Sequence, residues 1–260
     1  MEKIKIYQAD AFADELFKGN PAAICILDTE LSTKMMQDIA KENNLSETAY
    51  IFEKDGKLNI RWFTPGCEVD LCGHATLASA HILFNHENFQ GDIIEFQSKS
   101  GPLRIIKKED LLEMDFPAEI VKECAPEAII EKALGKKPLS TYLGTDYMAV
   151  FANESDIANF KPDFRELLAL KSRGLIVTAI GDNCDFVSRW FGPQSGVDED
   201  PVTGSAHCLL TPFWAGKLGK TSLTAKQISE RGGKLYCSLD GDRVKIAGKA
   251  VTYLEGYIFI

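Results

Sequence analysis

Two helix starts with glycine at the first position have the chemistry of an anion site. Gly73-His74 opens the segment GHATLASAHIL, and Gly204-Ser205 opens GSAHCLLTPFW. The first N–H groups of a helix lack partners within the helix and carry partial positive charge, so a carboxylate substrate can satisfy them. Glycine also lets a ligand approach the backbone. Close packing of helix and sheet would explain the same glycines equally well, and the helix starts alone leave both interpretations open.

Glu47 is the candidate acid/base residue. It lies in the segment NLSETAY, where a carboxylate stands at the entry to an apolar strand. Partial burial there would raise the pKa of the carboxyl toward neutrality, and such a group can both take up a proton and return it. The local sequence by itself favours the alternative, a solvated glutamate at a strand end.

Three acids, Asp198, Glu199 and Asp200, precede Pro201 and the second helix start. Such a cluster usually belongs to a solvated loop. Neighbouring acids can however raise one pKa, and a carboxyl ahead of a helix start can orient a hydroxyl or amine of a ligand. Proline restricts the residue before it to extended conformations, which is consistent with an aimed Asp200 side chain. The spacing does not choose among the three acids.

The four histidines differ in what they can do. His74 could relay a proton, because imidazole titrates near neutrality, and its alternative is a histidine held in the core. For His81 and His86 the structural role is favoured. His207, one turn into the second helix, is expected to pack, with a cleft-facing position as the alternative.

Strands are expected to dominate the elements that position these residues. Segments rich in β-branched, aromatic or alternating residues predict strands at 4–12, 22–27, 48–52, 58–63 and 93–97. A surface helix is predicted from Ser32, its cap, to about Asn43. The pattern changes after Phe116, where we place the boundary between domains 1–116 and 117–260. Later elements are a helix at 126–134, strands at 141–151 and 175–180, a hairpin at 234–246, and a final strand, 253–260, that can return to the first domain.

The two halves repeat one pattern. RWFTP precedes CGHAT in the first half, and RWFGP precedes TGSAH in the second. The helices that follow have few charges and no polar face, so both are expected to be buried, and Pro212 is expected to break or kink the second. The sequence therefore predicts an α+β chain in which a sheet curls around a central helix twice, with both helix starts at a cleft between the halves.

Composition excludes several classes of function. The net charge is −9, from 38 acidic and 29 basic residues, and no long basic run is present, which argues against nucleic acid as a partner. No apolar run reaches signal-peptide or membrane-span length, so a soluble cytoplasmic protein is expected. Seven scattered cysteines suggest reduced thiols, and the absence of paired CxxC or HxxxH elements argues against a metal site.

In its motifs the sequence resembles the phenazine-biosynthesis PhzF-like family, which is related to diaminopimelate epimerase. The resemblance runs through most of the chain in seven ordered blocks, DAF, GNPAA, LSET, RWFTP, CGHAT, EDPVTGSAH and RGG. It implies two pseudo-symmetric domains, each a mostly antiparallel barrel around a helix, with the active site between them and commonly a homodimer. It also implies Glu47 as the acid/base residue, with His74, Asp200 and Ser205 completing the catalytic set and no cofactor.

We therefore expect a cofactor-independent isomerase that moves a proton on a small cyclic or aromatic carboxylate, with Gly73, His74, Gly204 and Ser205 binding the substrate. One alternative is a two-thiol epimerase or racemase of amino acids. Cys72 fits one thiol position, but Thr203 takes the equivalent place in the second copy and Cys208 lies about a turn too deep. The other alternative is a non-catalytic metabolite-binding protein that has kept the cleft.

Overall fold

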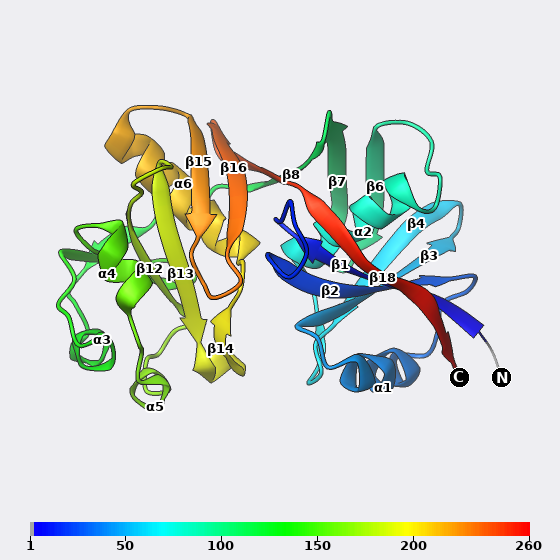
Figure 1. Cartoon of the computed structure of the whole chain (residues 1–260), viewed down its shortest axis with the longest axis horizontal. Coiled ribbons are helices and arrows are strands. Elements are labelled where there is room, and N and C mark those ends of the chain that lie inside the picture. The colour runs from blue at the N-terminus through cyan, green and yellow to red at the C-terminus, as the bar shows by residue number, and fades with distance from the viewer. Residues whose placement is uncertain (1–2) are drawn as a thin grey trace. The chain divides into compact units, whose positions relative to one another are not determined.

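The chain folds into two compact units (Figure 1). The computed structural model describes residues 3–260. Unit 1 contains the residues up to Asp115 together with Ala247–Ile260, and unit 2 is Phe116–Ile246. The returning segment is longer than the predicted 253–260, because strand β18 (Ala250–Phe259) pairs with β1 (Lys3–Ala11) over its whole length.

Unit 1 is an antiparallel sheet with two parallel pairings. Its strands hydrogen-bond in the order β18-β1-β2-β3-β4-β6-β7-β8, with the short β5 beside β4, and the parallel pairs are β2–β3 and β4–β6. Besides β1 and β18, the strands are β2 (Asn20–Leu27), β3 (Glu47–Lys54), β4 (Lys57–Phe63), β5 (Glu68–Val69), β6 (Ile93–Ser98), β7 (Gly101–Lys108) and β8 (Leu111–Pro117).

Two helices pack on the strands of unit 1. Helix α1 (Thr33–Asn43) begins as predicted, with Ser32 Oγ accepting the backbone N–H of Met35. Helix α2 (Gly73–Asn85) contacts β1, β2, β3 and β18, and its residues from His74 to Ala80 are all buried. A helix without a polar face is stable only when apolar surroundings cover it on nearly every side, and the sheet supplies that cover.

Unit 2 repeats this arrangement. Its strands pair in the order β9-β10-β11-β12-β13-β15-β16, with β14 beside β13. They are β9 (Lys122–Cys124), β10 (Ser140–Leu143), β11 (Tyr147–Val150), β12 (Leu175–Ile180), β13 (Phe186–Gly192), β14 (Val197–Asp200), β15 (Ser222–Gln227), β16 (Gly233–Asp240) and β17 (Arg243–Gly248). The helices are α3 (Ala128–Leu134), α4 (Glu154–Asn159), α5 (Phe164–Leu167) and the buried α6 (Gly204–Leu218), with a 3-10 turn at Pro193–Ser195.

The predicted internal repeat is present in the strand pairing. Strand β4 pairs antiparallel with β3 and β5 and parallel with β6, and β13 pairs in the same way with β12, β14 and β15. The arginine of each RWF motif makes the same two-pronged ion pair with the next strand, Arg61 with Glu68 and Arg189 with Glu199. Both guanidinium groups also lie over the ring of the motif's phenylalanine.

The predicted break of the second helix at Pro212 was wrong. Helix α6 continues through Pro212 to Leu218. A proline inside a helix frees the carbonyl four residues earlier, here that of Cys208. That carbonyl accepts the backbone N–H of Glu119, at 3.0 Å, so the group freed by the proline is satisfied and the helix persists.

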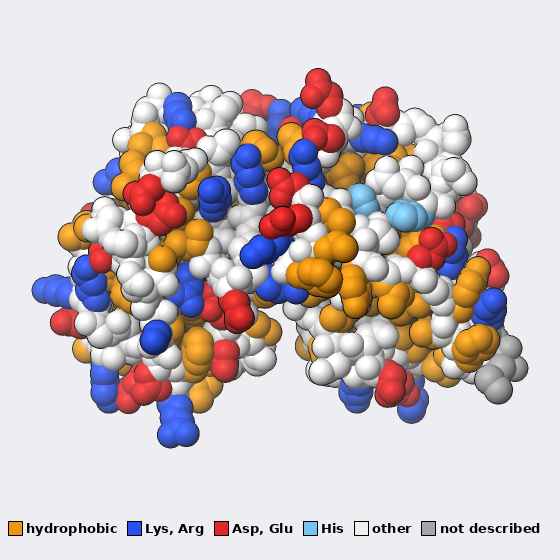
Figure 2. Space-filling view, in the orientation of Figure 1, with side chains coloured by type: hydrophobic (Ala, Val, Ile, Leu, Met, Phe, Trp, Pro, Cys, Tyr) orange, Lys and Arg blue, Asp and Glu red, His pale blue; other side chains and the backbone are white. Residues whose placement is uncertain are grey.

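Exposed apolar side chains gather along β18, as the space-filling view shows (Figure 2). Tyr253, Tyr257 and Phe259 are each about half exposed or more, and the exposed ring of Phe17 packs against that of Tyr253. The expected homodimer stays a prediction. Among the described residues, no helix is both long and apolar enough to cross a membrane.

Candidate active site

Glu47 and His74 meet in unit 1. Glu47 is the first residue of β3 and His74 the second residue of α2. Glu47 Oε2 lies 3.1 Å from His74 Nε2, and the side chains are 17% and 7% exposed. In the described part of the chain neither atom makes an aligned hydrogen bond to another group. The two groups therefore form a close, sheltered contact in which each still has hydrogen-bonding capacity for a ligand.

The other ring nitrogen of His74, Nδ1, contacts side chains other than Glu47. Nδ1 lies 3.5 Å from Cys72 Sγ and 3.3 Å from Asn20 Nδ2. Cys72 is the residue before α2 and Asn20 the first residue of β2, so the ring is held from two elements. This hold fixes the orientation of the imidazole toward Glu47.

The protonation states at this contact follow from burial and charge. Burial alone would lower the pKa of His74, but the charges and hydrogen bonds of Cys72 and Glu47 outweigh it and raise the pKa well above its usual value. Burial, followed by the charge of Glu47, raises the pKa of the Cys72 thiol. The raised pKa of His74 favours its imidazolium form near neutral pH.

Glu47, Cys72 and His74 are also close enough to raise the question of a metal ion, since one ligand atom of each lies within 4.8 Å of the others. The imidazole, however, presents Nε2 to Glu47 and Nδ1 to Cys72. One ring can offer a single ion only one of these nitrogens. Either the carboxylate or the thiol would have to turn around the ring, so the observed contacts do not present all three groups to a single ion.

Asp200 and Thr203 form the corresponding approach to α6 in unit 2. Asp200 ends β14, and Thr203 Oγ1 donates to its carboxylate. Gln227 fixes this turn, because its side chain accepts the Thr203 N–H at 2.8 Å and donates to the Asp200 carbonyl at 2.7 Å. The half-buried Asp200 side chain is thereby held beside the start of α6.

Ser205, the second residue of α6, is exposed and contacts a fixed arginine. Arg173 Nη2 donates to Ser205 Oγ at 3.0 Å. The same guanidinium makes a two-pronged ion pair with Asp146, which is fully buried and also accepts from Trp190 Nε1. Asp200 lies close enough for its charge to act on Arg173.

Comparison with known proteins identifies the family and agrees with the fold. The family model described as "Phenazine biosynthesis-like protein" matches residues 9–256. The chain belongs to this family. A curated protein of Pseudomonas aeruginosa, named an uncharacterised isomerase, is 49% identical over 99% of this chain and 100% of its own. Our chain is accordingly an isomerase of the PhzF-like type.

Solved structures show the same fold. The crystal structure of a PhzF-family phenazine biosynthesis protein from Enterococcus faecalis is 45% identical, with a TM-score of 0.98 and full coverage of both chains. A predicted epimerase of Pseudomonas aeruginosa, at 18% identity and a TM-score of 0.72 over 99% of both chains, shares the fold.

The structure distinguishes among the acids Asp198, Glu199 and Asp200, which the sequence could not do. Glu199 is tied to Arg189 by two hydrogen bonds of 2.7 Å. Asp198 is exposed and lines a surface hollow with residues of α5. Asp200 alone of the three acts on Arg173 and contacts Thr203, next to the start of α6.

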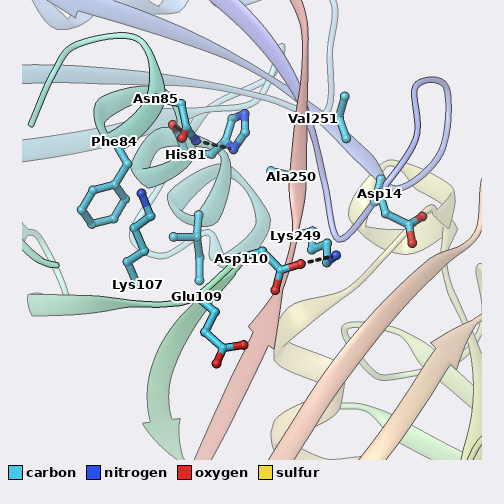
Figure 3. Close-up of a pocket in the computed structure, with 12 residues that line it drawn as sticks. Asp14, His81, Phe84, Asn85, Lys107, Glu109, Asp110, Lys249, Ala250 and Val251 are labelled. Atoms are coloured by element: carbon cyan, nitrogen blue, oxygen red, sulfur yellow. Dashed lines mark hydrogen bonds and ion pairs between the residues drawn. The ribbon is translucent and has the colours of Figure 1, made fainter.

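The remaining histidines, His207, His81 and His86, have contacts other than Glu47 and His74. His207 is fully buried, donates from Nδ1 to the Thr203 carbonyl, and burial lowers its pKa to about 4. His81 and His86 both contact Thr252 Oγ1. Figure 3 shows His81 bonded to Asn85 in the wall of a 420 Å³ hollow of unit 1, whose lining residues include neither Glu47 nor His74.

Arg173 is the site residue that sequence reasoning missed. It stands in the segment KSRGL, which has no motif character and follows no predicted helix. The signal that could have pointed to Arg173 is the internal repeat. Phe63 pairs with Thr48, and Phe191 pairs with Leu175, so the residue that corresponds to Glu47 is Gly174, directly after Arg173.

Proposed function

We propose that this isomerase moves a proton between two carbons of a small cyclic or aromatic carboxylate, with Glu47 as the acid/base group and without a cofactor. The observation that carries the proposal is the 3.1 Å contact between Glu47 Oε2 and His74 Nε2, two sheltered atoms that have hydrogen-bonding capacity left. A sheltered carboxylate that is ionised but little hydrated is an effective base.

Each step uses groups that the fold holds in place. The Glu47 carboxylate removes a proton from an activated C–H, and the electron pair of that bond shifts into the conjugated system of the substrate. The imidazolium of His74 stabilises negative charge as it develops. Glu47 then protonates another carbon, and because its carboxyl proton can exchange with solvent before this transfer, the product can carry a solvent hydrogen. Atoms and electrons balance without an oxidant.

Unit 2 supplies the groups proposed for binding. Ser205 and the backbone N–H groups that open α6 suit a carboxylate, and Gly204 gives access to the backbone. In unit 1, Gly73 gives a ligand the same access to the backbone at the start of α2. The Asp200 carboxylate suits a hydroxyl or amine of the substrate.

The two-thiol mechanism has less support. Cys72 precedes α2, but Thr203 precedes α6, and Cys208 is the fifth residue of that helix. Burial raises the pKa values of both Cys72 and Cys208. A protonated thiol is a poor base.

The test is proton exchange in deuterated water with a library of cyclic and aromatic carboxylates, read by mass spectrometry. Wild-type protein should incorporate deuterium into a substrate, and Glu47→Gln should lower the rate by roughly 10²- to 10⁴-fold. Glu42→Gln changes an exposed glutamate of α1 and serves as the matched control. Full activity of Glu47→Gln would contradict the proposal, and carboxylate binding without any exchange would favour a non-catalytic binding protein.

A further inference from the structure

The internal repeat assigns Arg173 a place in the site. In unit 1, the residue at the entry to β3, Glu47, contacts the second residue of α2, His74. In unit 2, the residue just before the entry to β12, Arg173, contacts the second residue of α6, Ser205. Arg173 lies one residue before Gly174, the counterpart of Glu47, so the two copies place a carboxylate and a cation at neighbouring positions beside their helix starts.

Arg173 is rigidly supported. Its Nε and Nη2 both bond to Asp146, which is completely buried, and Trp190 Nε1 donates to the same carboxylate at 3.1 Å. The Trp190 ring packs where a side chain on Gly174 would lie, since a Cβ there would come within 2.3 Å of it. The Arg173 carbonyl accepts from Ser195 Oγ at 2.8 Å, which holds the backbone as well.

The Nη1 edge of the Arg173 guanidinium is available to bind a ligand. Across residues 3–260 the hydrogen bonds of Arg173 come from Nε and Nη2, which leaves both Nη1 hydrogens for a ligand, and the side chain is 39% exposed. Since Ser205 Oγ accepts from Nη2, its own hydroxyl proton points elsewhere and can be donated. Nη1 and the Ser205 hydroxyl thus form two neighbouring donors, the geometry that a planar carboxylate accepts with its two oxygens.

We propose that Arg173 and Ser205 together bind the carboxylate of the substrate, and that Asp146 positions Arg173 for this role. The proposal rests on the proposed isomerase function and adds the residue that selects a carboxylate. Because Asp146 already balances the charge of Arg173, and Asp200 is nearby, the contribution of Nη1 is that of a directed donor more than of net positive charge. A moderate preference for carboxylates follows.

The experiment measures the dissociation constants of benzoate and its neutral isostere benzamide by NMR titration or calorimetry. Wild-type protein should prefer benzoate by about tenfold, equivalent to ~1.4 kcal/mol. Arg173→Met should reduce this preference to about twofold or less, and Arg173→Lys should keep part of it, since lysine retains a donor but not the fork. Asp146→Asn should also weaken the preference, because it loosens the guanidinium.

Two controls keep the outcome decisive. Arg165→Met removes an exposed cation of α5 and should leave the preference unchanged, and circular dichroism checks that every variant is folded. The proposal is overturned if wild-type protein binds benzoate no better than benzamide, or if folded Arg173→Met keeps the full preference. Failure of the isomerase proposal would give a different result, namely undiminished deuterium exchange in Glu47→Gln.

Discussion

Glu47 and His74 are 27 residues apart in the sequence, yet Glu47 Oε2 lies 3.1 Å from His74 Nε2 in a sheltered contact at the start of α2. Their counterparts by the internal repeat are the neighbourhood of Arg173 and the residue Ser205, which contact each other at the start of α6. The two copies of the fold thus carry different functional groups beside their buried helices. The copy in unit 1 holds a carboxylate beside an imidazole, and the copy in unit 2 has hydrogen-bond donors that suit an anion.

The pKa of His74 should be found well above the ordinary value of ~6.5. Because the folded-state pKa is the higher one, the stability that the Glu47 contact contributes is fully present below about pH 6.5 and is lost as the pH rises through the folded-state value. NMR titration of the four histidines measures this directly. The free energy of unfolding of wild type relative to His74→Gln should shrink as the pH rises above about 6.5, and a pH-independent difference would contradict the assignment.

His207 should behave in the opposite way. Burial lowers its pKa to about 4, so the unfolded chain binds the proton more readily. Stability should therefore fall as the pH drops from ~6.5 to ~4, by up to about 3 kcal/mol from this group. Urea unfolding of His207→Leu should show a shallower loss over the same range. A His207 resonance that titrates near pH 6.5 would refute this.

Replacing Cys72 by Ser should leave deuterium exchange within about threefold of wild type, because the thiol contacts His74 but does not carry the proton in our mechanism. The double change Cys72→Ser with Cys208→Ser should give the same result. A loss comparable to that of Glu47→Gln would instead support the two-thiol mechanism. Rates with one exchanging substrate are sufficient for the comparison.

Arg189→Met should destabilise the chain by roughly 3 kcal/mol, since it removes one partner of a largely buried ion pair. Arg189 bonds to Glu199 twice and to the carbonyls of Ile157 and Phe160, and all of these groups would lose their donor. Lys34→Met breaks the exposed pair with Asp38 and should have little effect on stability, because solvent screens the pair. Equal effects of the two changes in chemical denaturation would show that the buried pair is not special.

The buried helices and the repeat could be derived from the sequence, because both are local properties. GHATLASAHIL and GSAHCLLTPFW have no polar face, and each RWF motif is followed by one of these two helix segments. The α1 cap at Ser32 is equally local, since the capped N–H is three residues away. The candidate residues Glu47 and His74 were found by residue type and motif position.

Tertiary structure decided the contacts that give those residues their properties. The elevated pKa of His74 depends on burial and on Glu47, and the pairing of Arg173 with Asp146 depends on the register of separate strands. From the sequence Pro212 was predicted to break or kink its helix, and the continuation of the helix could not be foreseen because the N–H that pairs with the Cys208 carbonyl comes from Glu119, far back in the chain. Such contacts join residues distant in sequence, and their energies depend on a local dielectric that exists only once the chain has folded.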